Sequence, residues 1–320
     1  MKAIRVHVHG GADALTLDDV PEPVPGPGEV LVRLAAAGVN FVDTYHRSGQ
    51  YRADLPITLG SEGAGEVVAV GEGVEGVSVG QHVGSTNFAG AYAELATARA
   101  ERVVPIPDGV GDETAAAALL QGMTAHYLLH DSYPVKAGDT ILVHAAAGGM
   151  GLLLTQLASR MGARVIGTVS TPEKAELARG AGAAETLDYD EIAARVRALT
   201  DGEGVAAVYD GVGASTFDAS LASVRRHGVL VVYGAASGPV PPVDVQRLSA
   251  AGSIYLTRPT LAHFIVSPAD LARRAGDVLR WVADGVLDIR IGGRYLLADA
   301  ARAHADLEAR RTTGKLVLIP

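Results

Sequence analysis

Short apolar runs separated by glycines dominate roughly the first 120 residues. Stretches such as EVLVRLAAAGV (29–39) and GEVVAVGEGVEGVSVGQHVG (65–84) are rich in valine and contain a glycine every few residues. β-Branched runs with regularly spaced turn signals are typical of barrel-like β domains. We therefore expect a mostly β unit over residues 1–122.

The pattern changes after this point. ETAAAALLQGMTAHYLLHD (113–131) has helical periodicity, and apolar strands such as TILVHA (140–145) then alternate with helical segments as far as HGVLVVYG (227–234). Continuous apolar strands that alternate with helices predict a parallel sheet covered on both faces. We expect an α/β, doubly wound domain over residues 123–256.

The last sixty residues do not continue this alternation. Two amphipathic helical segments, DLARRAGDVLRWVADG (270–285) and ADAARAHADLEARR (298–311), precede an apolar strand, GKLVLIP. We expect residues 257–320 to fold back onto residues 1–122 and to complete the first domain.

Residues 140–159 carry no formal charge, but glycines and polar side chains interrupt them. A membrane-spanning helix needs about 20 predominantly apolar residues in one continuous helix. The stretch AAGGMG (146–151) instead follows the first strand of the alternating region and opens its first helix. It matches the dinucleotide fingerprint, with alanine in place of the first glycine. Gly148, Gly149, Met150 and Gly151 are therefore predicted to hold a pyrophosphate, and the alternative is a tight turn needed only for packing.

The end of the second strand indicates which dinucleotide binds. NAD-binding domains usually place an acidic residue there for the ribose 2′-hydroxyl, whereas this chain has TVSTPEK (168–174). The hydroxyl of Ser170 and the cation of Lys174 suit a 2′-phosphate, and Tyr189 after the third strand offers a phenol. Glu173 is the counter-argument, but an acid in a first helical turn is favourable in its own right. We expect NADP(H).

Charge and composition exclude other classes. The net charge is −9 and no segment is strongly basic, so a nucleic-acid partner is not expected. The chain has no cysteine, which removes disulfides, thiolate chemistry and cysteine-ligated zinc. MKAIRVHVHGG (1–11) alternates like a strand and lacks the apolar core of a secretory leader. A cytoplasmic protein without membrane insertion is expected.

Several motifs together resemble one family. AAAGVNFVDTYHRSGQY (35–51), LGSEGAGEVVAVG (59–71), HAAAGGMG (144–151), VYDGVG (208–213) and YLTRP (255–259) are similar to segments of the medium-chain dehydrogenase/reductase superfamily. Within it the chain resembles the zinc-independent NADPH:quinone oxidoreductases related to zeta-crystallin. The resemblance implies a GroES-like β-barrel catalytic domain, a Rossmann domain, NADPH as cofactor and a homodimer.

The resemblance also bears on metal use. Zinc members carry a cysteine near the position of Asn40 and a histidine where this chain has Ser61. Hydride transfer without a metal needs an acceptor that is already electrophilic. A quinone fits, because hydride addition gives a phenolate that hydrogen-bond donors stabilise. An α,β-unsaturated carbonyl fits nearly as well.

The same resemblance assigns site residues. Asn40, Tyr45 and Tyr51 are expected as donors beside the nicotinamide, although Asn40 would also suit the closing of a turn and the tyrosines a cleft rim. Asp43 could orient a neighbouring residue, but it is interpreted as a solvated loop carboxylate. The family positions that imply cofactor contacts are Asn40, Phe41, Asp43, Thr124, Tyr233, Gly234, Ala235, Leu256, Thr257, Arg258 and Arg310.

Two other functions remain open at this level. An enone or alkenal reductase would share the fold and the cofactor and differ only in pocket shape. A non-catalytic NADPH-binding protein, structural or RNA-associated, would keep the cofactor site without turnover.

Overall fold

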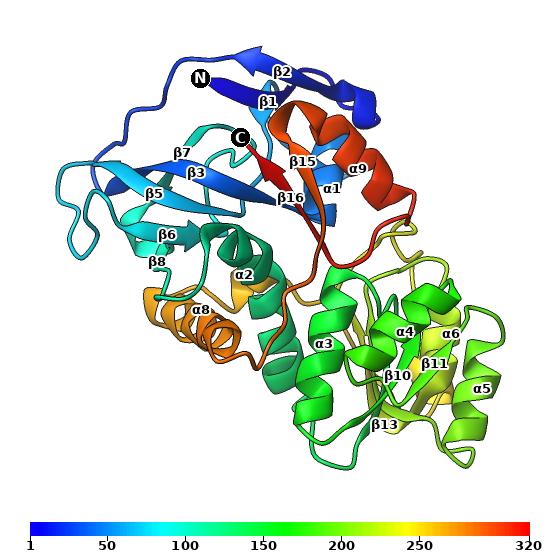
Figure 1. Cartoon of the computed structure of the whole chain (residues 1–320). Coiled ribbons are helices and arrows are strands. Elements are labelled where there is room, and N and C mark those ends of the chain that lie inside the picture. Colours follow the sequence, from blue (N-terminus) through cyan, green and yellow to red (C-terminus); the bar gives the residue numbers. More distant parts are fainter. The chain divides into compact units, whose positions relative to one another are not determined.

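The computed structural model describes all 320 residues, which divide into two compact units. Unit 1 combines Met1–Met123 with Ile265–Pro320, and unit 2 is the continuous segment Thr124–Phe264. In Figure 1 the blue and cyan start of the chain and its orange and red end belong to unit 1. The later division falls after Phe264 rather than after the expected residue 256. The Phe264 ring stacks on Tyr127, also of unit 2, with ring centroids 4.1 Å apart.

Unit 1 contains two sheets around one core. The larger sheet has the order β15-β16-β3-β5-β6-β8, with β7 also paired to β3, and the smaller has the order β2-β1-β4. Apolar residues of both sheets, among them Ile4, Val32 and Leu316, share one cluster. The strands are β1 (Lys2–Val6), β2 (Leu15–Asp19), β3 (Glu29–Val39), β4 (Ile57–Thr58), β5 (Gly63–Val70), β6 (His82–Ser85), β7 (Leu95–Arg99), β8 (Val104–Pro105), β15 (Ile291–Leu296) and β16 (Lys315–Ile319).

The C-terminal segment returns to unit 1, as its pattern predicts. Strand β16 lies between β15 and β3, and Leu316 pairs with Val39 in antiparallel register. The two amphipathic segments form α8 (Pro268–Ala283) and α9 (Ala300–Glu308). Strand β15 was not anticipated, since its burial alternates between intermediate and exposed positions and its apolar signal is weak.

A helix interrupts the β region where the sequence indicated a loop. Helix α1 (Phe41–Ser48) begins where the Asn40 amide donates to the Asp43 carboxylate at 2.8 Å. It ends at Gly49, whose φ of +78° is the left-handed conformation common at helix ends. Its short length, about two turns, gives too little periodicity to separate a helix from a loop.

Unit 2 is a doubly wound α/β fold. Its six strands are all parallel and have the order β11-β10-β9-β12-β13-β14. Numbered from the first strand this is 3-2-1-4-5-6, the dinucleotide-binding order, which confirms the predicted fold class. The strands are β9 (Thr140–Val143), β10 (Arg164–Thr168), β11 (Glu185–Leu187), β12 (Val205–Asp210), β13 (Val224–Val232) and β14 (Tyr255–Thr257).

Helices connect these strands and pack against the sheet (Figure 1). They are α3 (Gly149–Arg160), α4 (Pro172–Gly180), α5 (Ile192–Leu199), α6 (Phe217–Ser223) and α7 (Gln246–Ala250), while α2 (Asp112–Tyr127) leads from unit 1 into unit 2. Helix α6 stops at Ser223, because Val224 already begins β13. The sheet's apolar cluster includes Leu142, Val208 and Leu230.

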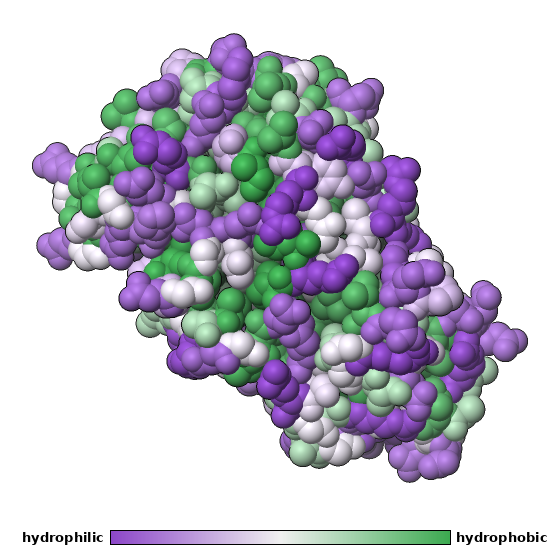
Figure 2. Space-filling view, viewed as in Figure 1, coloured by the Kyte–Doolittle hydropathy of each residue, from purple (hydrophilic) through white to green (hydrophobic).

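The visible surface is mixed in character. Figure 2 shows hydrophilic residues spread over the faces of both units that are in view. None of the helices combines the length and the apolar character that crossing a bilayer requires.

Candidate functional site

The turn after β9 has the geometry of a phosphate cradle. Ala145 adopts a left-handed φ of +51°, and Gly148 precedes α3 as its N-cap. A Cβ on Gly151 would lie 2.2 Å from the Ala145 carbonyl oxygen, so only glycine allows the first turn of α3 to pack this closely on the preceding backbone. The helix N-terminus leaves backbone N–H groups for an anion. The turn therefore fits a dinucleotide pyrophosphate.

Three other predicted cofactor residues surround this turn. The ammonium of Lys174 donates to the Ser170 hydroxyl at 3.3 Å, and the Ala145 amide donates to the Tyr189 hydroxyl at 3.2 Å. Ser170 and Tyr189 each lie two residues beyond the end of their strand. The pKa of Glu173 is lowered by hydrogen bonds to its own amide and to Thr171, which is the ordinary behaviour of an acid in a first helical turn.

The remaining predicted contacts of unit 2 lie at the same edge of the sheet, with one exception. Tyr233, Gly234 and Ala235 follow β13, and Leu256, Thr257 and Arg258 end or follow β14. Because all six strands are parallel, their carboxyl ends meet at one edge, where open α/β sheets bind ligands. Thr124 belongs to α2 rather than to a strand end.

A buried chain of polar side chains lies beneath the cradle. His144 Nδ1 lies 2.9 Å from the Thr168 hydroxyl, and Nε2 lies 2.8 Å from the Ser220 hydroxyl. Ser220 donates to the Asp210 carboxylate at 2.7 Å, so its oxygen accepts from His144 Nε2–H and Nδ1 accepts from Thr168. Burial lowers the pKa of His144 and keeps the ring neutral. These hydrogen bonds connect the carboxyl ends of β9, β10 and β12 with one another and with α6.

In unit 1, Asn40 is held on all sides. Its Nδ2 donates to the Glu62 carboxylate at 2.8 Å and to the Gly38 carbonyl at 3.3 Å, while its Oδ1 accepts from the Lys315 ammonium at 2.6 Å. Both amide protons are therefore used within the protein. The side chain joins β3, β5 and β16 at a point where all three polar groups are buried.

Asp43 corrects one sequence interpretation. It is 3 % exposed rather than solvated, because α1 turns it towards the core. Its carboxylate accepts from the Asn40 amide at 2.8 Å and from the Tyr92 hydroxyl at 3.1 Å. Burial raises the pKa of Asp43 to about 7, against the opposing effect of those donors and of Lys315.

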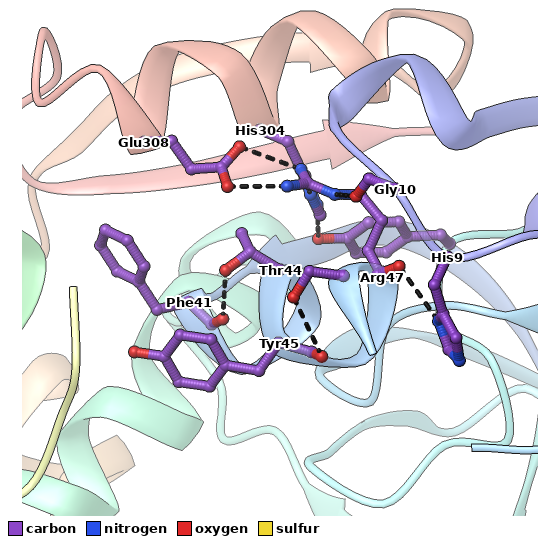
Figure 3. Close-up of polar contacts among 10 residues, drawn as sticks. His9, Gly10, Phe41, Thr44, Tyr45, Arg47, His304 and Glu308 are labelled. Carbon is purple, nitrogen blue, oxygen red and sulfur yellow. Dashed lines mark hydrogen bonds and ion pairs between the residues drawn. The ribbon is translucent and has the colours of Figure 1, made fainter. Parts of the chain in front are cut away.

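Aromatic rings gather around α1. The ring centroids of Tyr45 and Phe41 are 6.4 Å apart, and those of Tyr45 and Tyr51 are 5.3 Å apart in an edge-on arrangement. The His46 ring also meets the Tyr51 ring edge-on. Figure 3 shows the rings of Phe41 and Tyr45 on one side of α1 and the guanidinium of Arg47 on another. Tyr51 is 38 % exposed and Tyr45 is 8 % exposed, so Tyr51 presents its ring more openly.

Arg310, the last predicted contact, is exposed just beyond α9 and has a left-handed φ of +58°. Sequence reasoning missed Glu62, Lys315, Tyr92 and His304. The available signal was a single lysine at the head of an otherwise apolar strand, KLVLI. Across the whole chain, no three His, Cys, Asp or Glu side chains are grouped as metal ligands.

Two family models match the chain, one within the first part of unit 1 and one over most of unit 2 and the following residues to 281. The description "zinc-binding dehydrogenase" matches residues 149–281, and "alcohol dehydrogenase GroES-like domain" matches residues 26–108. A GroES-like unit joined to a dinucleotide-binding unit defines the medium-chain dehydrogenase/reductase class, which confirms the expected fold.

The relatives are similar over their full length. The quinone oxidoreductase of Pseudomonas aeruginosa is 49 % identical and aligns with 100 % of this chain and 99 % of its own. A 2-haloacrylate reductase from Burkholderia sp is 40 % identical, over 99 % of this chain and 98 % of its own. The solved structure of a mycobacterial protein complexed with NADPH has a TM-score of 0.98 and 56 % identity, over all of both chains. The chain belongs to the quinone oxidoreductase family and is an enzyme.

Proposed function

We propose that this enzyme reduces quinones by hydride transfer from NADPH without a metal ion. The observation that carries the proposal is the phosphate cradle at Gly148–Gly151, with Lys174 and Ser170 beyond the neighbouring strand. No carboxylate replaces Ser170 to repel a 2′-phosphate. The quinone oxidoreductase relatives and the NADPH complex support the same cofactor and acceptor.

NADPH, when bound, supplies the hydride. The backbone N–H groups at the start of α3 would hold its pyrophosphate, and the cation of Lys174 would pair with the 2′-phosphate. The Tyr45 and Tyr51 hydroxyls would donate to the acceptor's oxygen, where negative charge develops. Asn40 would support the site and not donate to the acceptor, because both of its amide protons are already donated to Glu62 and Gly38.

The proposal of metal independence rests on the chain's own residues. No cysteine is present, and Ser61 stands where zinc members carry histidine. The positive charge beside Asn40 is the ammonium of Lys315, which donates to Asn40 and pairs with Glu62, so a side chain and not a metal ion supplies the cation there.

A second function is reduction of an activated carbon–carbon double bond. The 2-haloacrylate reductase relative favours it, since its named acceptor is an unsaturated carboxylate. An enolate formed from an α,β-unsaturated carbonyl needs the same donors as a phenolate. The family resemblance also supports a homodimer, which equilibrium sedimentation would test.

The deciding experiment follows NADPH oxidation in parallel with 1,4-benzoquinone, a naphthoquinone and a simple enone, with and without a chelator. Fast quinone turnover that the chelator does not change supports the proposal. Fast enone turnover with slow quinones supports the double-bond reductase. Tight NADPH binding without turnover of any acceptor supports a non-catalytic role, and loss of activity with the chelator contradicts the metal-free mechanism.

A further inference from the structure

A buried arginine anchors the C-terminal turn of α1. The Arg47 guanidinium is 3 % exposed and meets the Glu308 carboxylate with two parallel bonds, of 2.7 and 3.0 Å. Its Nε donates to the Gly10 carbonyl at 3.2 Å, and its Nη1 donates to His304 Nδ1 at 3.1 Å. Figure 3 shows these contacts converging on one guanidinium from α9 and from the N-terminal segment.

The arginine fixes the protonation of His304. An arginine N–H can only donate, so Nδ1 must carry a lone pair and the ring's proton must sit on Nε2. Burial, together with the charge of Arg47, lowers the pKa of His304 to about 3, which keeps this ring neutral. Nε2–H then donates to the Tyr92 hydroxyl, 3.0 Å away.

The same sequence of hydrogen bonds continues from His304 through Tyr92 to the N-terminal end of α1. Because the Tyr92 oxygen accepts from His304, its own proton is available for the Asp43 carboxylate at 3.1 Å. That carboxylate accepts in turn from the Asn40 amide, which precedes the first residue of α1. Both ends of this short helix are thus held by one chain of bonds that starts at Arg47.

We propose that Arg47, His304 and Tyr92 are positioning residues, which fix α1 through Asp43 and so place the Tyr45 and Tyr51 hydroxyls for the acceptor. The inference rests on the proposed function in its catalytic part only. A displacement of about 1 Å at a reacting group can cost on the order of a hundredfold in rate, so the holding of a two-turn helix matters to turnover.

The test compares Tyr92→Phe, Arg47→Lys and the double variant with the full-length parent enzyme. Tyr92→Phe keeps a buried ring and removes one hydroxyl, and Arg47→Lys keeps the charge but not the forked contacts. We expect each to lower kcat/KM for the quinone at least about tenfold, with NADPH affinity unchanged. The double variant should lose no more than the more damaging of the two single variants, because losses at residues that act as one chain are non-additive. Losses that multiply would overturn the proposal.

The pH profile separates positioning from general destabilisation. Four groups face Asp43: the Asn40 amide and the Tyr92 hydroxyl donate to it, Lys315 of β16 stabilises its charge, and Glu62 opposes it. Loss of the Tyr92 hydroxyl removes a stabilising donor, so Asp43 would take up a proton at higher pH. The acid-side fall of kcat/KM should therefore move to higher pH in Tyr92→Phe, and an unmoved profile would overturn the proposal.

Hydrogen exchange gives a readout that does not depend on turnover. Amides of residues 41–48 should exchange faster in both single variants. Arg302→Ala serves as the matched control, because Arg302 also lies on α9 and forms an exposed pair with Asp299. If the parent enzyme reduces no acceptor, the proposed function fails, while exchange still decides whether the chain holds α1. Unchanged exchange overturns the inference even where Arg47→Lys cannot be purified, since Tyr92→Phe alone supplies the result.

Discussion

The Lys315 ammonium and the Glu62 carboxylate form an ion pair inside unit 1, with Nζ 2.6 Å from Oε2 and side chains only 2 % and 0 % exposed. Glu62 also accepts from the Leu120 amide at 2.6 Å. This buried pair joins the start of β16 and the residue before β5 to the middle of α2. Each of the two buried charges depends on the other for its neutralisation.

Removal of one partner should therefore be costly. Lys315→Met keeps the volume but leaves the buried Glu62 charge without its cation, and we expect a loss of about 3–5 kcal/mol in unfolding free energy. Urea denaturation measures it. The exposed pair of Lys2 with Asp19 is the control, and Lys2→Ala should cost no more than about 1 kcal/mol. Equal small losses in both variants would refute the buried pair's importance.

Gly151→Ala tests the cradle. The added Cβ would lie 2.2 Å from the Ala145 carbonyl oxygen, so the turn after β9 must shift. We expect NADPH affinity, measured by calorimetric titration, to fall at least about tenfold, the equivalent of 1.4 kcal/mol. Gly180→Ala is the matched control, because a Cβ there meets nothing within 4 Å. Unchanged affinity in Gly151→Ala would mean that the pyrophosphate binds elsewhere.

Lys174→Ala tests the choice of cofactor. The ammonium lies 3.3 Å from the Ser170 hydroxyl, where a 2′-phosphate is proposed to bind. Loss of a charge-assisted contact of about 1.5–3 kcal/mol should weaken NADPH more than tenfold and NADH little. Lys136→Ala, on an exposed lysine that precedes β9, is the control. Equal losses for the two nucleotides would contradict the 2′-phosphate assignment.

His304 should make stability depend on pH in a defined direction. Its pKa is about 3 in the folded protein and about 6.5 in an unfolded chain, so only the unfolded state takes up this proton between those values. The folded state is therefore disfavoured progressively as the pH falls below about 6.5, by up to about 1.4 kcal/mol per pH unit.

The comparison variant is His304→Gln, which cannot titrate. The stability advantage of the parent protein over this variant should shrink between pH 7 and pH 4, and Asp43, present in both, cancels in the difference. Exposed His263→Gln should change stability by less than about 0.5 kcal/mol at neutral pH. A constant difference between the parent protein and His304→Gln across that range would show that His304 is protonated in the folded state.

The sequence predicts the fold more completely than it predicts which polar side chains are buried and paired inside unit 1. Continuous apolar strands in alternation with helices define a covered parallel sheet, because only that arrangement buries both faces of each strand. The glycine turn is equally local, since its backbone demands are met by residues 145–151 alone. The burial of Asp43 could not be predicted in the same way, because the eight residues of α1 are shorter than the 11–18-residue window in which helical periodicity is recognised.

The missed residues have a common cause. Arg47 and His304 are 257 positions apart, and Glu62 and Lys315 are 253 positions apart. A charged residue in an apolar strand signals that a partner must exist, but no local pattern shows which distant side chain it is. Pairing of this kind is set by the order of strands in the sheet, which only the folded structure supplies.

The placement of β16 has a consequence for synthesis on the ribosome. Residues 37–39 of β3 pair with β16, whose residues follow the whole of unit 2 in the chain. Unit 2 emerges as one continuous segment, whereas the sheet of unit 1 waits about 190 residues for this strand, on the order of ten seconds or more at typical rates of translation. During that interval the end of β3 presents unpaired backbone groups, the kind of edge that recruits other nascent chains. Slow elongation after residue 264 would prolong this exposure, and chaperones that cover strand edges would act on residues 1–123 during this interval.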